Sequence, residues 1–248
     1  MLPDFGINEA LKRRASTNPD STLLVTLDGT SLGARSLQSR VESAAAGFHE
    51  AGIGPGSHVL TAIGNSVDAV VWFLALAKLG AVWIPVNPET RGPGLRHIVR
   101  TANAQLLIVA DELVDNFTAA EANETSQRIM SRREAAELLN RTRDASTRDQ
   151  DPRDLDELRC IIFTSGTTGP PKGVMVTERM LMAAAAATGL ASRVEDADVF
   201  LFWEPLHHIG GSQLVILALL EDIRLVLVPR FSASRFWDQV HKFGVTKL

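Results

Sequence analysis

Residues 161–174 combine side chains and backbone types that bind phosphate. The segment reads Ile-Ile-Phe-Thr-Ser-Gly-Thr-Thr-Gly-Pro-Pro-Lys-Gly-Val, so an apolar stretch leads into hydroxyl and glycine residues and then Lys172. Glycine lets the backbone approach a ligand closely. Backbone N–H groups beside Ser and Thr hydroxyls make an anion cradle, and lysine adds a positive point charge of the kind used on phosphates. These residue types predict a phosphate-binding loop.

The spacing excludes a Walker A loop. That motif requires Gly-x-x-x-x-Gly-Lys-Ser/Thr. Counting from Gly166, the second glycine would stand at position 171, which is Pro171. Lys172 is followed by Gly173 rather than by Ser or Thr. Two prolines also stiffen the stretch that would have to wrap the phosphate.

The same segment closely resembles the phosphate-binding signature of the adenylate-forming superfamily, which comprises acyl-CoA synthetases, peptide-synthetase adenylation domains and luciferases. The family pattern is Tyr/Phe-Thr-Ser-Gly-Thr-Thr-Gly-x-Pro-Lys-Gly-Val, and every position of residues 163–174 fits it. An ordinary Gly/Pro loop between a strand and a helix would not be expected to match throughout. The resemblance implies that the β- and γ-phosphates of ATP are held by Thr164, Ser165, Gly166, Thr167, Thr168, Gly169 and Lys172, with Thr167 near Mg²⁺.

Two further segments resemble the family in the expected order. Residues 204–211 resemble its Pro-x-x-His-x-x-Gly motif, which identifies His208 as the family histidine. The resemblance implies that His208 lies beside the reacting carboxylate and that Ile209 and Gly210 line an acyl pocket. For His207 a packing role is favoured. Residues 65–88 resemble an early motif of the family, which indicates fold rather than site.

The resemblance implies a two-step reaction. A carboxylic acid attacks the α-phosphate of Mg-ATP, pyrophosphate leaves, and a thiol, often that of coenzyme A, takes the acyl group. The residues 231–240 resemble carnitine/crotonobetaine-CoA ligase-like sequences more than amino-acid adenylation domains. A peptide-synthetase-type adenylation domain and a non-catalytic, truncated nucleotide-binding paralogue remain alternatives.

The family is about twice as long as this chain. Its Tyr-Gly-x-Thr-Glu and Thr-Gly-Asp motifs, its hinge residue and its C-terminal lysine have no counterpart among these residues. Residues 245–248 resemble the start of another strand, with no turn or cap after it. We therefore expect an incomplete N-terminal AMP-binding domain that lacks the C-terminal domain and is inactive alone, with an open sheet edge that favours self-association.

Alternating apolar segments are expected to position these residues. A hairpin is predicted around Asp28-Gly29. Strands are predicted at 58–63, 81–86, 105–110, 160–164, 199–203 and 224–228, and helices at 36–52, 66–79, 94–102, 178–190, 211–220 and 234–243. Strands that alternate with helices indicate an α/β fold with mostly parallel sheets covered by helices.

The stretch 111–157 interrupts this alternation. Residues 141–159 hold 11 charged residues in 19. Such a run is typical of a solvated insertion or a mobile connection. We therefore predict a first βα block at 1–110, a charged variable connection at 111–157, and a phosphate-loop and acyl-pocket block at 158–248.

Composition narrows the classes of function. The 248 residues carry a net charge of −4, which is not the footprint of a nucleic-acid-binding protein. Cys160 is the single cysteine, so no disulfide can form within the chain. No segment is apolar for long enough to predict a membrane span or a secretory signal, and we expect a cytoplasmic protein.

Overall fold

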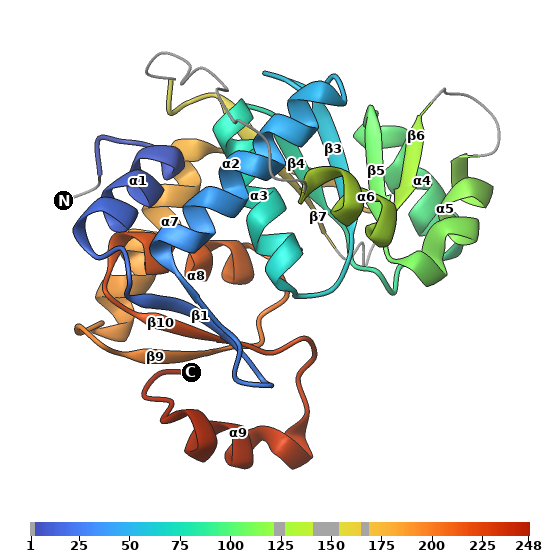
Figure 1. The fold of residues 1–248 in the computed structure, drawn as a ribbon. Coiled ribbons are helices and arrows are strands. Elements are labelled where there is room, and N and C mark those ends of the chain that lie inside the picture. Colours follow the sequence, from blue (N-terminus) through green and yellow to red (C-terminus); the bar gives the residue numbers. More distant parts are fainter. Residues whose placement is uncertain (1–2, 122–126, 141–153, 165–168) are drawn as a thin grey trace.

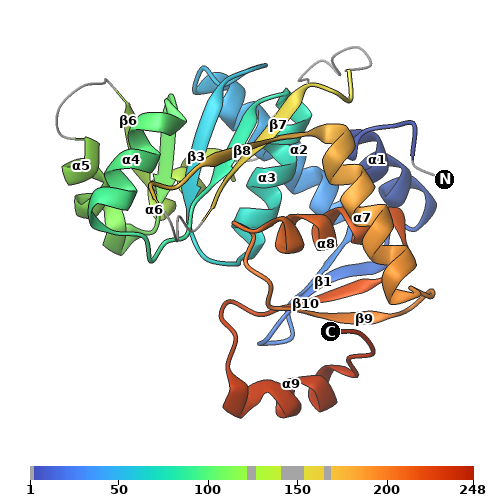
Figure 2. The same cartoon turned by 180° about the vertical axis from the view of Figure 1, so that it is seen from behind.

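The computed structural model describes residues 3–121, 127–140, 154–164 and 169–248. Two sheets enclose a layer of helices, and further helices cover the outer face of each sheet (Figures 1 and 2). The predicted α/β architecture is confirmed. The two sheets take strands from distant parts of the sequence, so neither sheet is formed by one continuous segment.

The first sheet has the strand order β2-β1-β10-β9. The predicted hairpin joins its antiparallel pair, and Gly29 in the turn has a φ of +92°, which glycine adopts without strain. The other pairs, β1 with β10 and β10 with β9, are parallel. The bounds are β1 (Thr22–Thr26), β2 (Ser31–Gly33), β9 (Val199–Phe202) and β10 (Arg224–Leu227).

The second sheet has the order β6-β5-β3-β4-β7-β8. All of its pairs are parallel except β7 with β8. Its strands are β3 (His58–Ala62), β4 (Val82–Pro85), β5 (Leu106–Val109), β6 (Arg128–Ser131), β7 (Leu158–Phe163) and β8 (Gly173–Thr177).

The middle layer contains the main hydrophobic core. Its two most apolar helices, α3 and α8, are buried along most of their length, as expected for helices between two sheets. Side chains of both sheets reach this core, including Trp83 from β4 and Phe200 from β9. The helices of this layer are α1 (Ile7–Thr17), α2 (Ala34–Glu50), α3 (Val67–Leu79), α6 (Arg132–Leu139), α7 (Glu178–Ser192) and α8 (Ile209–Leu220).

Smaller cores form on the outer faces of the sheets. Phe117, on one of the outer helices, packs with apolar residues of the second sheet, and Val199 and Leu201 of β9 face the last helix on the outer side of the first sheet. Alternate residues of β9 therefore point to opposite cores. The outer elements are α4 (Gly92–Ala102), η1 (Asp111–Leu113), α5 (Val114–Glu121), η2 (Ala233–Arg235) and α9 (Phe236–Phe243).

The first half of the predicted connection at 111–157 contains regular secondary structure. Residues 111–140 form η1, α5, β6 and α6, and β6 extends the second sheet in parallel with β5. A four-residue strand flanked by charged residues gives little periodic signal. The predicted sequence blocks do not form separate sheets. β1 and β2 pair into the sheet of β9 and β10, and β7 and β8 pair into the sheet of β3 to β6.

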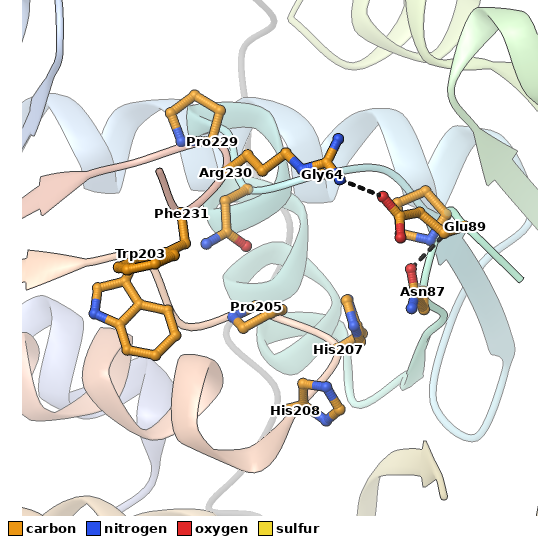
Figure 3. A pocket seen from close by; sticks show the side chains of 12 residues that line it. Gly64, Asn87, Glu89, Trp203, Pro205, His207, His208, Pro229, Arg230 and Phe231 are labelled. Carbon is orange, nitrogen blue, oxygen red and sulfur yellow. Dashed lines mark hydrogen bonds and ion pairs between the residues drawn. The ribbon is translucent and has the colours of Figure 1, made fainter. Parts of the chain in front are cut away.

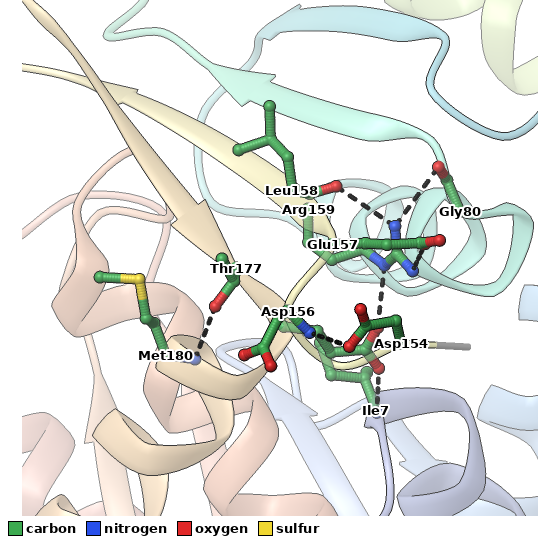
Figure 4. A network of polar contacts seen from close by, with 10 residues as sticks. Ile7, Gly80, Asp154, Asp156, Glu157, Leu158, Arg159, Thr177 and Met180 are labelled. Carbon is green, nitrogen blue, oxygen red and sulfur yellow. Dashed lines mark hydrogen bonds and ion pairs between the residues drawn. The ribbon is translucent and has the colours of Figure 1, made fainter. Parts of the chain in front are cut away.

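A buried ion pair lies where the solvated run was expected to continue. Only 2% of Arg159 is exposed. Its Nε donates to Glu178 Oε2 at 2.8 Å and its Nη2 donates to Glu157 Oε2 at 2.7 Å (Figure 4). Glu178 Oε1 accepts the backbone N–H of Ile7 at 2.7 Å. This network joins β7 and α7 to the start of α1.

In the described part of the chain, no helix has the length and apolar character needed to cross a membrane.

Candidate active site

A cavity of about 430 Å³ opens where four strands end (Figure 3). Its wall is made by the segments that follow the carboxyl ends of β3 and β4 in one sheet and of β9 and β10 in the other. Open α/β sheets bind ligands at this edge. The lining residues are Gly64, Asn65, Asn87, Pro88, Glu89, Trp203, Pro205, His207, His208, Pro229, Arg230 and Phe231.

The segment after β9 is held in a defined shape on α8. The backbone N–H of His208 donates to Pro205 O at 3.0 Å. A Cβ on Gly211 would lie 2.4 Å from the same carbonyl oxygen, so only glycine fits there. By contrast, a Cβ on Gly210 would lie 3.2 Å from Glu204 Oε2, at the end of a side chain that can move. The two glycines therefore have different surroundings.

Two adjacent histidines project from this segment. The centroids of the His207 and His208 rings lie 4.5 Å apart. Burial, together with the nearby His208, lowers the pKa of His207 to about 4. His207 is therefore neutral at physiological pH and can offer one ring nitrogen as donor and the other as acceptor. His208 is the more exposed of the two.

The phosphate-binding motif lies on the hairpin between β7 and β8. The residues at its base are paired, because Thr164 N donates to Lys172 O at 3.0 Å and Lys172 N donates to Thr164 Oγ1 at 3.2 Å. His97 of α4 makes a 2.9 Å hydrogen bond to Pro171 O. Lys172 is exposed, and no salt bridge engages its side chain in the described residues.

This hairpin differs from the strand–loop–helix arrangement expected from the sequence. Residues 173–177 form β8 before α7 begins, and β8 pairs antiparallel with β7. Gly173 is opposite Phe163, and a Cβ on it would approach Ile161 Cγ2 to 2.8 Å. The glycine that ends the motif therefore lets the two strands pack.

The hairpin and the cavity share one sheet edge. β7 is parallel to β4, so the carboxyl ends of both strands point to the same edge. Thr164 directly follows β7, and Asn87 and Glu89 of the cavity wall follow β4. The base of the predicted phosphate loop therefore follows a strand next to β4, whose following residues form part of the cavity that His208 also lines.

Only one of the three predicted acyl-pocket residues lines the cavity. His208 lines the cavity, whereas Ile209 and Gly210 begin α8 and are not part of the lining. Thr164, Gly169 and Lys172 are exposed around the hairpin. Ser165, Gly166, Thr167 and Thr168 lie outside the described residues.

Sequence reasoning missed several lining residues. His207 was expected to have a packing role, and Asn87, Glu89, Trp203, Arg230 and Phe231 were not singled out, yet all line the cavity. The signal that could have found them is their position at the end of predicted strands or within a few residues after it, at the carboxyl edge of the sheets. Arg230 Nη2 also lies 3.3 Å from Glu89 Oε1 and joins two sides of the wall (Figure 3).

A second, apolar depression adjoins the cavity. It has a volume of about 430 Å³ and shares Trp203 and Phe231 with the first cavity. The Trp203 and Phe231 rings lie 5.1 Å apart, within the usual range for aromatic pairs. The remaining lining residues are Ala233, Phe236, Trp237 and Leu248.

Comparison with known proteins identifies the family. The family model described as AMP-binding enzyme matches residues 11–248. The chain is 32% identical to long-chain fatty acid transport protein 5 of Mus musculus, over 96% of this chain and 38% of that protein. It is 28% identical to 2-succinylbenzoate–CoA ligase of Bacillus anthracis, over 95% of this chain and 46% of that protein. The chain thus spans less than half the length of these relatives.

Solved structures share this fold. The N-terminal domain of FACL13 from Mycobacterium tuberculosis superposes with a TM-score of 0.88 and 25% identity, over 97% of this chain and 61% of that one. A fatty acyl-CoA synthetase of the same organism superposes with a TM-score of 0.86 and 24% identity, over 97% of this chain and 48% of that one. With its phosphate-binding signature and its fold, the chain belongs to the AMP-binding enzyme family and corresponds to the N-terminal portion of acyl-CoA ligases.

Proposed function

We propose that this chain is the N-terminal part of an ATP-dependent acid–thiol ligase. In the first step a carboxylate oxygen of the acid attacks the α-phosphorus of ATP, the α–β phosphoanhydride bond breaks, and pyrophosphate leaves from an acyl-adenylate. In the second step the thiolate of coenzyme A attacks the acyl carbonyl, and AMP leaves as the thioester forms. The family match and relatives named as CoA ligases support this proposal.

The observation that carries the proposal is the shared edge. The base of the signature hairpin follows β7, and the cavity bearing His208 includes the segment after the neighbouring strand β4. A triphosphate held by the hairpin and an acid held in the cavity would therefore lie at the same edge of the sheet. Such positioning can supply much of the catalysis in phosphoryl and nucleotidyl transfer, since little covalent help from the protein is needed.

The chain's own residues have the following roles in this proposal. Thr164, Gly169 and Lys172, with Ser165, Gly166, Thr167 and Thr168 between them, hold the phosphates that leave as pyrophosphate. The exposed Lys172 ammonium offsets negative charge on the leaving group, because a preorganised charge stabilises the transition state without reorganisation. His208 orients the acid's carboxylate, and Ile209 and Gly210 border the acyl group at the start of α8.

The side chains fit a metal that arrives with the nucleotide. Over the described residues, no group of three or more His, Cys, Asp or Glu side chains could hold a metal ion. Mg²⁺ commonly binds through substrate phosphates and few protein ligands. We place the hydroxyl of Thr167 near this ion, which would neutralise charge on the phosphates.

We propose coenzyme A as the thiol acceptor and the cytoplasm as the place of the reaction. Relatives named as CoA ligases, from several bacteria, favour coenzyme A over a carrier-protein thiol. The proposed substrate is a carboxylic acid.

Exchange of labelled pyrophosphate into ATP tests the proposal in the complete enzyme. A Thr167→Ala/Thr168→Ala variant should lose exchange while remaining folded. Each lost hydrogen bond to a charged oxygen costs about 1.5–3 kcal/mol, or roughly tenfold to hundredfold in rate. Thr118→Ala, on the exposed surface of α5, is the matched control. Unchanged exchange in the folded double variant would refute the phosphate assignment.

A further inference from the structure

One side-chain amide links the two sheets at the cavity. Asn65 follows β3 of the second sheet, whereas Glu204 and Leu206 follow β9 of the first. Asn65 Nδ2 donates to Glu204 O at 2.8 Å, and Leu206 N donates to Asn65 Oδ1 at 2.9 Å. Asn65 is 8% exposed. The amide thus acts as both donor and acceptor, as a backbone peptide group does within a sheet.

The two backbone groups that bond to Asn65 lie on either side of Pro205. Pro205 shapes the segment that carries His207 and His208. Pro205 lies between Glu204 and Leu206, and its carbonyl accepts the N–H of His208 at 3.0 Å. The same carbonyl is the atom that excludes a side chain at position 211. Fixing the backbone on both sides of Pro205 therefore fixes the start of α8 and the direction of both histidines.

We propose that Asn65 is a positioning residue. It sets the position of the histidine segment, residues 204–208, which forms one wall of the proposed acid-binding cavity, relative to the β7–β8 hairpin that carries the phosphate-binding motif. This inference rests on the proposed function. β3 and β7 are both direct neighbours of β4 in one sheet, so Asn65 and the hairpin base both follow strands of that sheet. The histidine segment belongs to the other sheet. The amide therefore sets how the acid-binding wall faces the ATP-binding loop.

This role requires an amide rather than merely a polar group. Asn65→Asp retains an acceptor for Leu206 N, but it replaces the donor with a carboxylate oxygen that faces the Glu204 carbonyl. Asn65→Leu removes both bonds at similar volume. The buried side chain of Leu206 still anchors the segment in the core, so the loop can shift without the domain unfolding.

The first test measures steady-state kinetics of the complete enzyme. Asn65→Asp and Asn65→Leu should lower kcat/KM for the acid by about tenfold to a hundredfold, as expected for unmet hydrogen bonds in a buried site. The dissociation constant for ATP, measured by calorimetry without acid, should stay within about twofold of the wild-type value. The hairpin is in the same sheet as Asn65 and not on the histidine segment that would shift. Asn140→Asp, at the exposed end of α6, is the matched control. Equal losses of ATP affinity and of kcat/KM for the acid, or no loss of either, would overturn the positioning role.

The second test does not depend on turnover. Labelling of histidines with diethyl pyrocarbonate, read by mass spectrometry, reports the exposure of the half-buried His207. Its labelling rate should rise several-fold in both Asn65 variants, while that of the exposed His49 stays constant. An unchanged His207 rate would overturn the proposal. If the wild type shows no pyrophosphate exchange with any acid but the labelling rises, the ligase proposal fails and the positioning of the wall stands.

Discussion

His207 and His208 are adjacent in the sequence but differ in exposure. The motif resemblance singles out His208, and the structure adds His207 to the same cavity wall. Burial lowers the pKa of His207 to about 4, so the ring stays uncharged where an ordinary histidine would begin to protonate. His207, for which the sequence predicted a packing role, therefore keeps its part of the cavity wall uncharged at neutral pH.

The first prediction concerns pH. The pKa of His207 is about 4 when folded and about 6.5 when unfolded, so the unfolded chain binds the proton more tightly. Stability from the neutral ring is fully present above the unfolded pKa and is lost as the pH falls from about 6.5 toward 4. His207→Phe should lose less stability than the wild type over this window. Urea unfolding at pH 7.5 and pH 5 measures the difference.

His49→Phe is the control for this experiment, because His49 is exposed near the end of α2. It should show the pH dependence of the wild type. If His207→Phe also shows the wild-type dependence, the pKa of His207 is the same in the folded and unfolded states, and its depressed value in the folded state is wrong.

Adjacent glycines give a second prediction. Gly211→Ala would place Cβ 2.4 Å from the Pro205 carbonyl oxygen, a backbone atom, whereas Gly210→Ala would meet only the end of Glu204. Overpacking against fixed atoms costs about 1–3 kcal/mol. Gly211→Ala should therefore lower the midpoint of thermal unfolding, and Gly210→Ala should lie near the wild type. Equal midpoints for the two variants would contradict the close approach.

At the scale of elements, helices and strands with strong apolar periodicity could be predicted from the sequence, whereas strands with weak periodicity could not. The helix at 66–79 was expected, and α3 occupies Val67–Leu79 with Ser66 capping it through a 3.2 Å bond from Ala69 N. β8 was missed because three of its five residues are exposed, so it lacks a buried face, and β6 was missed among charged residues. The cavity joins two sheets, and no local pattern encodes which sheet a strand enters.

Arg159 and Glu178 illustrate a long-range contact that the sequence does not reveal. Glu178 stands at the start of the helix predicted at 178–190, where nothing in the sequence indicates a buried partner. Instead Glu178 pairs with Arg159 in the interior and accepts the N–H that opens α1 (Figure 4). The start of the chain and two elements from its second half therefore meet at this carboxylate.

The third prediction follows from that pair. Arg159→Met should destabilise the domain by about 3–5 kcal/mol, because it leaves a buried carboxylate without its partner. Arg159→Met/Glu178→Gln should recover part of this loss, since the glutamine side chain is uncharged and can still accept the Ile7 N–H. Denaturant unfolding of both variants, with Arg179→Met as an exposed control, measures the recovery. A double variant no more stable than Arg159→Met would show that the cost lies in packing and not in the unpaired charge.

For the whole molecule, the last described residues continue the first sheet. Lys247 pairs in parallel with Phe200 of β9, and Thr246 Oγ1 donates to Asp198 Oδ1 at 2.6 Å. Although burial alone would raise it, the pKa of Asp198 is lowered by hydrogen bonds from Thr246 and the Glu195 backbone and by Lys247. Residues 245–248, predicted from sequence to start a strand, therefore lie beside β9 rather than leaving its whole edge open.

The last prediction is that residues 1–248 alone catalyse neither acyl-adenylate nor thioester formation. The hairpin and one cavity wall are present, but the family's adenine-, ribose- and magnesium-binding motifs and its C-terminal lysine have no counterpart in these residues. Each missing oriented group commonly costs about two to three orders of magnitude in rate. Losing several together should leave only weak phosphate binding. We also expect self-association through the part of the β9 edge that residues 245–248 leave unpaired, visible as concentration-dependent mass in sedimentation. The decisive comparison is pyrophosphate exchange by residues 1–248 and by the complete enzyme over the same panel of carboxylic acids. Exchange at similar rates would mean that these residues hold a complete adenylation site, and the division of the active site between this domain and the rest of a longer enzyme would have to be abandoned.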